Sequence, residues 1–123
     1  MTAYALGRLE RPDGPVHSRV LDYLRDVEDT LEPFGGRFLV HGAPVDVREG
    51  QWEGDVVLIA FPDLPSAQGW YDSSAYAVIR PWRTEHIRGD VVLVDGVSPD
   101  HHAVDLTKAL SAPNVSADVC ERA

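Results

Sequence analysis

Between residues 16 and 34, apolar side chains recur every three or four positions, as they do along one face of an α-helix. Charged residues fill most of the intervening positions, so the pattern predicts an amphipathic helix with one buried face. Pro15 suits its first turn, whereas Pro33 and the Gly35–Gly36 pair predict its end. The apolar positions are Val16, Val20, Tyr23, Leu24, Val27, Leu31 and Phe34.

Short apolar runs predict four β-strands, over residues 4–9, 37–48, 55–61 and 90–97. Residues 55–61 are apolar at successive positions, which indicates a strand covered on both faces. Pro44 removes a backbone donor from the second segment, which is therefore expected at a sheet edge or a bulge.

A second helical region is predicted from Leu64 to about Arg83, with Pro65 in its first turn. Asp72-Ser73-Ser74 combines a break with a new N-cap, so we expect two short helices here. Pro81 is expected to limit the length of the second helix.

The predicted order β-α-β-β-α-β is that of an α+β, ferredoxin-like βαββαβ domain, a four-stranded antiparallel sheet with both helices on one face. We assign residues 1–97 to this domain and residues 98–123 to a C-terminal tail that is partly helical or disordered. The other face of the sheet needs a cover. A second copy of the chain is the simplest one and would give a homodimeric α/β barrel.

Composition excludes several classes of partner. Twenty acidic residues against eleven Lys and Arg give a net charge of -9, which argues against nucleic acid and against anionic membrane surfaces. No apolar run approaches the ~18 residues of a membrane span, and the N-terminus lacks a signal-peptide pattern, so we expect a cytoplasmic protein. The single cysteine, Cys120, cannot form an intrachain disulfide.

The stretch FGGRFLVHG, residues 34–42, is a glycine turn followed by a strand that two polar residues interrupt. Regular alternation places Arg37, Leu39 and His41 on one face and Phe38 and Val40 on the other. Histidine suits acid–base chemistry near neutral pH, so His41 is a catalytic candidate; the alternative is a structural histidine beside the bulge. Arg37 is a substrate-binding candidate, or else it pairs with helix carbonyls or an acidic residue.

Tyr76 and Arg80 are one helical turn apart and are expected to reach the same place, where they could bind a carboxylate, an enolate or a phenol. They are our second and third catalytic candidates, and the alternative is that Arg80 pairs with an acidic side chain. Trp70 and Tyr71 are substrate-binding candidates, or else core aromatics.

Two further substrate-binding candidates, Glu49 and Trp52, flank the loop before the third strand. Trp52 would cover a pocket mouth or pack across a dimer, and Glu49 would act as a base or form a structural ion pair. His101 and His102 are adjacent but lack the three or four ligands of a metal site, so no metal is expected. No cofactor-binding motif is present, so no cofactor is expected either.

The stretch FGGRFLVHGAPVDVREGQWEGDVVLIAFPDLPSAQGWYDSSAYAVIRPWR resembles the family called domain of unknown function 1330, over about residues 3–97. The resemblance implies the ferredoxin-like, dimeric α/β-barrel superfamily, which includes cofactor-free monooxygenases, muconolactone isomerases, polyketide cyclases and haem-dependent members. This is a fold-level analogy. Two positions depart from the family pattern: His41 replaces the usual Arg, and Ser74–Ala75 replaces the usual Pro–Glu. The motif residues are Gly35, Gly36, Arg37, Phe38, Leu39, Glu49, Gly50, Trp52, Phe61, Pro62, Trp70, Tyr71, Ser73, Tyr76 and Arg80.

These observations favour a dimer that binds a small molecule. Its enzymatic form would be a cofactor-free isomerase, cyclase or oxygenase acting on an acidic or phenolic organic substrate, with His41 moving a proton and Arg80 with Tyr76 holding an oxyanion. The alternatives are a non-catalytic structural or binding dimer, and an interaction module whose C-terminal tail recruits a partner.

Overall fold

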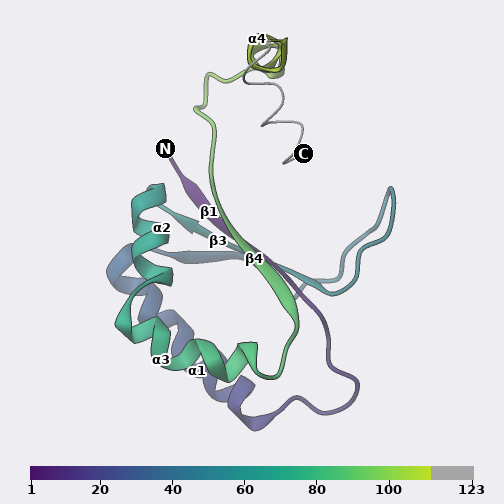
Figure 1. Ribbon diagram of the computed structural model, residues 1–123, viewed down its shortest axis with the longest axis vertical. Coiled ribbons are helices and arrows are strands. Elements are labelled where there is room, and N and C mark those ends of the chain that lie inside the picture. The colour runs from purple at the N-terminus through teal and green to yellow at the C-terminus, as the bar shows by residue number, and fades with distance from the viewer. Residues whose placement is uncertain (112–123) are drawn as a thin grey trace.

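The computed structural model describes residues 1–111. Cys120 and the end of the predicted tail lie outside this range. Four antiparallel strands form one sheet in the order β2-β3-β1-β4, with α1, α2 and α3 on one face (Figure 1). This arrangement confirms the predicted βαββαβ architecture. The elements are β1 (Ala3–Leu9), α1 (Ser18–Leu31), η1 (Glu32–Phe34), β2 (Arg37–His41), β3 (Asp55–Phe61), α2 (Leu64–Tyr71), α3 (Ser74–Thr84), β4 (Gly89–Asp95), η2 (Ala103–Asp105) and α4 (Leu106–Ser111).

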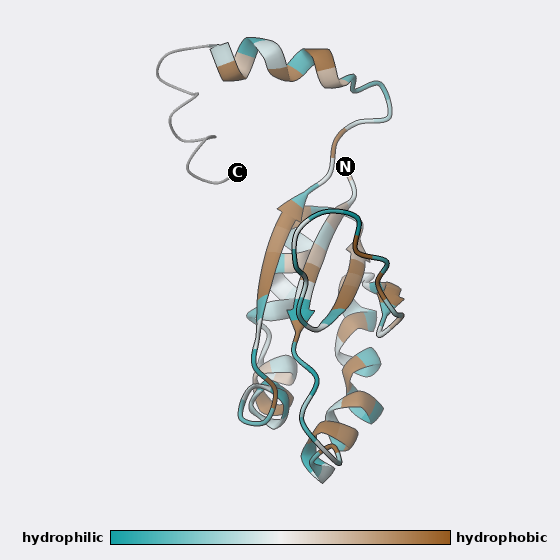
Figure 2. Cartoon of the chain, turned by 90° about the vertical axis from the view of Figure 1, so that its right-hand side faces the viewer, coloured by the Kyte–Doolittle hydropathy of each residue, from teal (hydrophilic) through white to brown (hydrophobic). Residues whose placement is uncertain are grey.

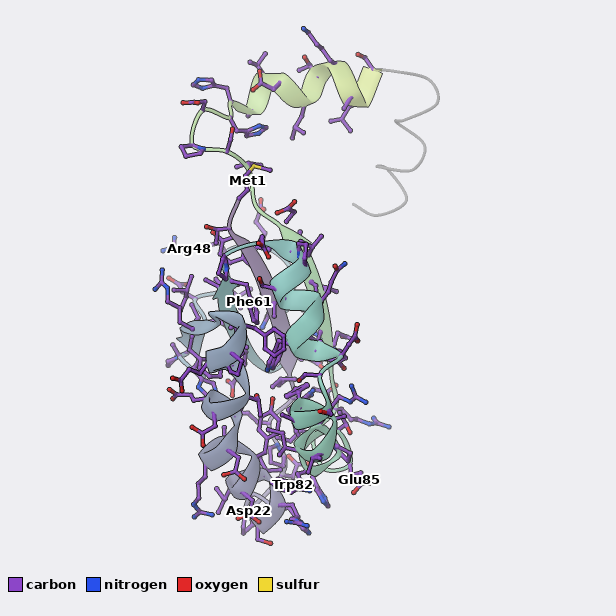
Figure 3. The ribbon with its side chains drawn as sticks, turned by 90° about the vertical axis from the view of Figure 1, so that its left-hand side faces the viewer. Met1, Asp22, Arg48, Phe61, Trp82 and Glu85 are labelled. Atoms are coloured by element: carbon purple, nitrogen blue, oxygen red, sulfur yellow. The ribbon has the colours of Figure 1, made fainter. Side chains whose placement is uncertain are left out.

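The hydrophobic core lies between the sheet and the three helices. β1 is central, and its Ala5 pairs with Ile59 of β3 and with Leu93 of β4. The Phe61 side chain points from the sheet into the layer between α1 and α2 (Figure 3). The buried members of the core are Ala5, Tyr23, Val27, Leu31, Ile59, Phe61, Ala67, Trp70, Tyr76 and Ile79.

The helix α1 begins two residues later than its apolar period suggests. His17 is its N-cap and accepts a hydrogen bond from the Arg19 backbone N–H at 3.0 Å, so Pro15 lies before the helix and not in its first turn. The end is as predicted: a 3₁₀ turn contains Pro33, and Gly35 adopts a left-handed φ of 70°.

The second helical region divides as predicted. The Ser73 hydroxyl caps α3 by accepting from the Tyr76 backbone N–H at 3.2 Å. The prediction that Pro81 limits α3 is wrong, because the helix continues to Thr84. Ile79 and Arg83, on either side of the proline, are both buried, so the helix continues along its packed face.

β2 is shorter than predicted, and regular alternation fails within it. The strand ends at His41, and its place at the sheet edge is confirmed. A register shift between Phe38 and Val40 places Phe38 opposite Ile59 and His41 opposite Val57. Phe38 and His41 therefore share the helix-covered face, contrary to the predicted alternation, because a bulge adds one residue to the strand.

The sheet face opposite the helices, called here the open face, is mostly apolar, and no helix within residues 1–111 covers it. The loop of residues 42–54 projects away from the helices on that side, and α4 lies apart from the sheet (Figure 1). β3 and β4 are mostly hydrophobic (Figure 2). No helix among the described residues is long and apolar enough to cross a membrane. Side chains on the open face include Tyr4, Leu6, Val56, Leu58, Val92 and Val94.

Candidate functional site

A cavity of about 610 Å³ lies between the sheet and the first half of α1, near the end of α3. This volume is within the usual range for small-molecule sites. The exposed loop residues Arg11, Pro12 and Gly14 line one side of it. Most of the wall is hydrophobic, and residues from both layers contribute to it, including Val20, Leu24, Phe38, Val57, Ile59 and Ile87.

Three polar side chains form a hydrogen-bonded cluster at the helix side of this cavity. The hydroxyl groups of Tyr23 and Tyr76 are 2.8 Å apart, and Arg83 Nη2 lies 3.4 Å from the Tyr76 hydroxyl. The Arg83 guanidinium also lies 5.6 Å from the centre of the Tyr23 ring. Tyr23 and Arg83 line the cavity, whereas Tyr76 lies behind them at 1% exposure.

Arg83 is a buried cation without a carboxylate. Arg83 is 6% exposed, and no acidic side chain among residues 1–111 forms an ion pair with it. Burial disfavours its charged form, but its interactions with Tyr76 and Tyr23 outweigh this effect and leave the pKa of Arg83 above its ordinary value. A neutral phenol offers this cation hydrogen bonds but no opposite charge.

Tyr23 is held as a neutral phenol. Burial, followed by the influence of Tyr76, raises the pKa of Tyr23 well above its ordinary value. The hydroxyl therefore keeps its proton across the physiological range. It can donate a hydrogen bond, but it does not act as a base.

His41 reaches the cavity because of the bulge in β2. Its ring stacks on Phe38, with centroids 4.2 Å apart and planes 4° from parallel. The same bulge brings both residues into the cavity wall. A regular strand would have pointed His41 to the open face.

The structure separates Tyr76 from Arg80. The Arg80 guanidinium lies 5.1 Å from the centre of the Tyr71 ring and donates to the Tyr71 carbonyl at 3.5 Å. Arg83 occupies the position beside the Tyr76 hydroxyl instead. Arg83 follows Tyr76 by seven residues, which is nearly two whole helical turns, so it lies more directly on the same side of the helix as Tyr76 than Arg80 does.

The remaining predicted residues lie outside the cavity. Trp70 is 2% exposed and donates from Nε1 to the Thr30 hydroxyl at 3.0 Å, within the core. Arg37 is exposed, beside the acidic end of α1. Glu49 and Trp52 belong to the projecting loop, where Trp52 is 41% exposed.

Sequence reasoning missed Tyr23 and Arg83 as site residues. Tyr23 was identified only as a core position. Arg83 carries a detectable signal, because it continues the buried face of Tyr76 and Ile79 at a spacing of four residues. A charged residue on an apolar helical face is unusual and merits attention as a site candidate.

No cluster of three or more His, Cys, Asp or Glu side chains suited to a metal occurs within residues 1–111. The family model of the Domain of unknown function (DUF1330) matches residues 2–97. This chain belongs to the DUF1330 family. None of the curated proteins matches it.

Two solved structures show the fold of this DUF1330 chain in other proteins. A dimeric ferredoxin-like protein of unknown function from Jannaschia sp. CCS1 has 13% identity and a TM-score of 0.62, covering 78% of this chain and all (100%) of that one. A protein of unknown function from Rhodopseudomonas palustris has 14% identity and a TM-score of 0.53, covering 80% and 84%. At these identities the likeness shows the ferredoxin-like fold alone.

The glycine pair of the DUF1330 motif has a structural explanation. A Cβ atom at Gly36 would lie 2.7 Å from Phe61 Cε1 and 2.8 Å from Leu31 Cδ2. Gly35 adopts a positive φ. These motif residues therefore build the turn into β2, and the cavity chemistry lies with other residues.

Proposed function

We propose that this DUF1330 protein is a homodimer that binds a small organic acid or phenol in the cavity between the sheet and the helices. One observation carries the binding proposal: the buried Arg83 guanidinium lies in the wall of an apolar cavity and has no carboxylate partner among residues 1–111. Buried charges are normally paired, because desolvating an ion costs several kcal/mol. An anionic ligand would supply the missing partner, and the apolar wall would accept its carbon skeleton.

The enzymatic form of the proposal is a cofactor-free isomerase. His41 would remove a proton from a carbon next to a carbonyl group; the C–H electron pair forms a C=C bond and the carbonyl oxygen becomes an oxyanion. Where a C=C bond lies beside that carbon, the enolate extends over it, and return of the proton to the far carbon shifts the double bond without any co-reactant. The oxyanion role predicted for Arg80 is better supported for Arg83, since Arg80 lies at Tyr71.

The open face supports the dimer. Val92 and Val94 are 52% and 47% exposed there, beside apolar side chains of β1 and β3. A contiguous apolar surface of this kind is typical of an interface. The solved structure from Jannaschia, which has the same fold, is described as dimeric.

Ligand binding is tested by thermal unfolding of the full chain with aromatic carboxylates, phenols and β-dicarbonyl compounds. A ligand at 100 times its dissociation constant should stabilise the native state by about 2.7 kcal/mol. We expect Arg83→Met to abolish the stabilisation, whereas the control Arg80→Met keeps it. Stabilisation that survives Arg83→Met would contradict the assigned site. If none of the three compound classes stabilises the protein, the non-catalytic dimer is favoured.

The dimer is tested by light scattering after size-exclusion chromatography. Val92→Asp places a charge on the open face and should yield monomers, since burying that carboxylate in an interface is costly. Val78→Asp is the matched control, because Val78 is 65% exposed on α3, in the helical layer. A wild-type monomer, or a dimer that tolerates Val92→Asp, would refute this interface.

A further inference from the structure

The hydrogen bonds of the Tyr23–Tyr76–Arg83 cluster have a definite direction. Arginine only donates, so the Arg83 guanidinium approaches a lone pair of the Tyr76 oxygen. Its positive charge also turns the Tyr76 hydroxyl hydrogen away from it. The Tyr23 oxygen lies 2.8 Å from the other side of this hydroxyl.

Burial determines which tyrosine donates to the other. Tyr76 is 1% exposed, and its hydroxyl contacts only Tyr23 and Arg83 among the side chains of residues 1–111. If Tyr23 donated, the Tyr76 hydrogen would be buried without an acceptor, at a cost comparable to that of a lost hydrogen bond. Tyr76 therefore donates to Tyr23.

The Tyr23 hydrogen is consequently left for the cavity. Tyr23 lines the cavity and is 8% exposed, and its oxygen already accepts from Tyr76. Arg83 also interacts with this oxygen, but arginine only donates, so the Tyr23 hydrogen has no acceptor within the described chain. Its donor strength is increased by the preceding hydrogen bonds, because each one polarises the next.

We propose that Tyr23 is the residue that binds the ligand oxygen, and that the ligand is a phenol or an enolisable ketone whose charge develops on that single oxygen. This inference rests on the proposed function and specifies the ligand class. A carboxylate is best bound by a two-pronged guanidinium. Here Nη2 of Arg83 is directed at Tyr76, and Tyr23 presents a single hydroxyl donor in the cavity wall. Phe38 supplies an aromatic surface for a planar ligand in the same wall.

Tyr76 acts in this scheme as a positioning residue, whereas Arg83 supplies the positive charge of the cavity wall. The contribution of Tyr76 reaches the ligand through the Tyr23 hydroxyl, so removal of the Tyr76 hydroxyl should weaken binding less than removal of the Tyr23 hydroxyl. Tyr71 provides a matched control. Its ring packs 5.4 Å from that of Tyr76, but its hydroxyl has no part in the cluster.

The test uses nitrophenols and nitrobenzoates of matched size with the full chain. Nitrophenol absorbance reports the ionised fraction of the bound phenol, a readout that a purely structural tyrosine would leave unchanged. We expect wild type to lower the apparent pKa of bound nitrophenol. Tyr23→Phe should weaken nitrophenolate binding about tenfold, the loss expected for one charge-assisted hydrogen bond. Tyr76→Phe should weaken it about threefold, and Tyr71→Phe should leave it unchanged.

The outcomes separate this inference from the proposed function. Binding of neither probe by wild type would refute both. Binding of both probes with no effect of Tyr23→Phe on nitrophenolate would overturn this inference alone, as would an equal loss for nitrobenzoate. Thermal unfolding of each variant identifies a folding defect. If Tyr23→Phe does not fold, the nitrophenolate affinities of Tyr76→Phe and Tyr71→Phe are compared instead. Equal affinities would overturn the inference.

Discussion

Replacing Arg83 by methionine should leave the unliganded protein as stable as wild type or more so. Methionine keeps the unbranched stem of the side chain and removes its charge. The substitution removes the 3.4 Å hydrogen bond that Arg83 donates to Tyr76. A hydrogen bond to a charged group contributes about 1.5–3 kcal/mol, and this long one belongs at the lower end.

The substitution also removes the free-energy cost of burying a charged guanidinium, because Arg83 is only 6% exposed in the folded chain. Replacement of buried ionic groups by apolar ones of similar volume is typically neutral or stabilising by about 1–4 kcal/mol. That range already includes the interactions lost with the ion, so we expect a change between about 0 and +4 kcal/mol in the free energy of unfolding. If Arg83 instead serves stability, its removal should lose at least the hydrogen bond to Tyr76, about 1.5–3 kcal/mol.

Equilibrium urea unfolding of the unliganded chain distinguishes the two cases. The midpoint should be unchanged or higher in Arg83→Met, with the same slope. Arg80→Met is the control and should lose only the weak stacking of its guanidinium on Tyr71, about 0.5–1 kcal/mol. A loss of about 1.5 kcal/mol or more in Arg83→Met, and a larger loss than in Arg80→Met, would show that the cation stabilises the fold. It would also remove the reason for expecting an anionic ligand.

Two further predictions concern the frame of the site. Gly36→Ala should destabilise the chain by about 1–3 kcal/mol in urea unfolding, because the new Cβ would collide with Phe61 and Leu31; an unchanged midpoint would mean that this turn relaxes freely. Hydrogen bonding from Ser66, through its hydroxyl and its backbone N–H, lowers the pKa of Asp63, the N-cap of α2. The stability that this adds is present above the ordinary aspartate pKa and is lost as the pH falls through the lower folded value, so an Asp63 titration at or above the ordinary value in NMR would contradict it.

Local patterns predicted most of the fold. Residues 55–61 form β3 over the predicted range because a run of apolar residues ending at a proline leaves few alternatives. The division at Ser73 followed from capping chemistry. His17 was not expected as an N-cap, since histidine is not among the residues that prefer this position. Pro81 was misjudged because propensity does not include the packing of its buried neighbours.

The site was harder to predict because it depends on pairing between distant segments. Alternation along the strand assumes one residue per pleat, and only the pairing of β2 with β3 reveals the bulge that turns His41 toward the helices. The partner of Tyr76 was sought one turn away at Arg80, whereas the hydroxyl lies at the far end of a long side chain and reaches Arg83. Tyr23 joins the cluster from another helix altogether.

The central position of β1 has a consequence for synthesis of the chain. β1 leaves the ribosome first, yet its two neighbours in the sheet come later, since Ala5 pairs with Ile59 and Leu93. At about 5–20 residues per second, the first strand waits several seconds for the second of these partners. Until then both of its edges lack their permanent neighbours. Formation of the sheet is therefore a late event, and the nascent first strand is the segment most in need of protection by a chaperone.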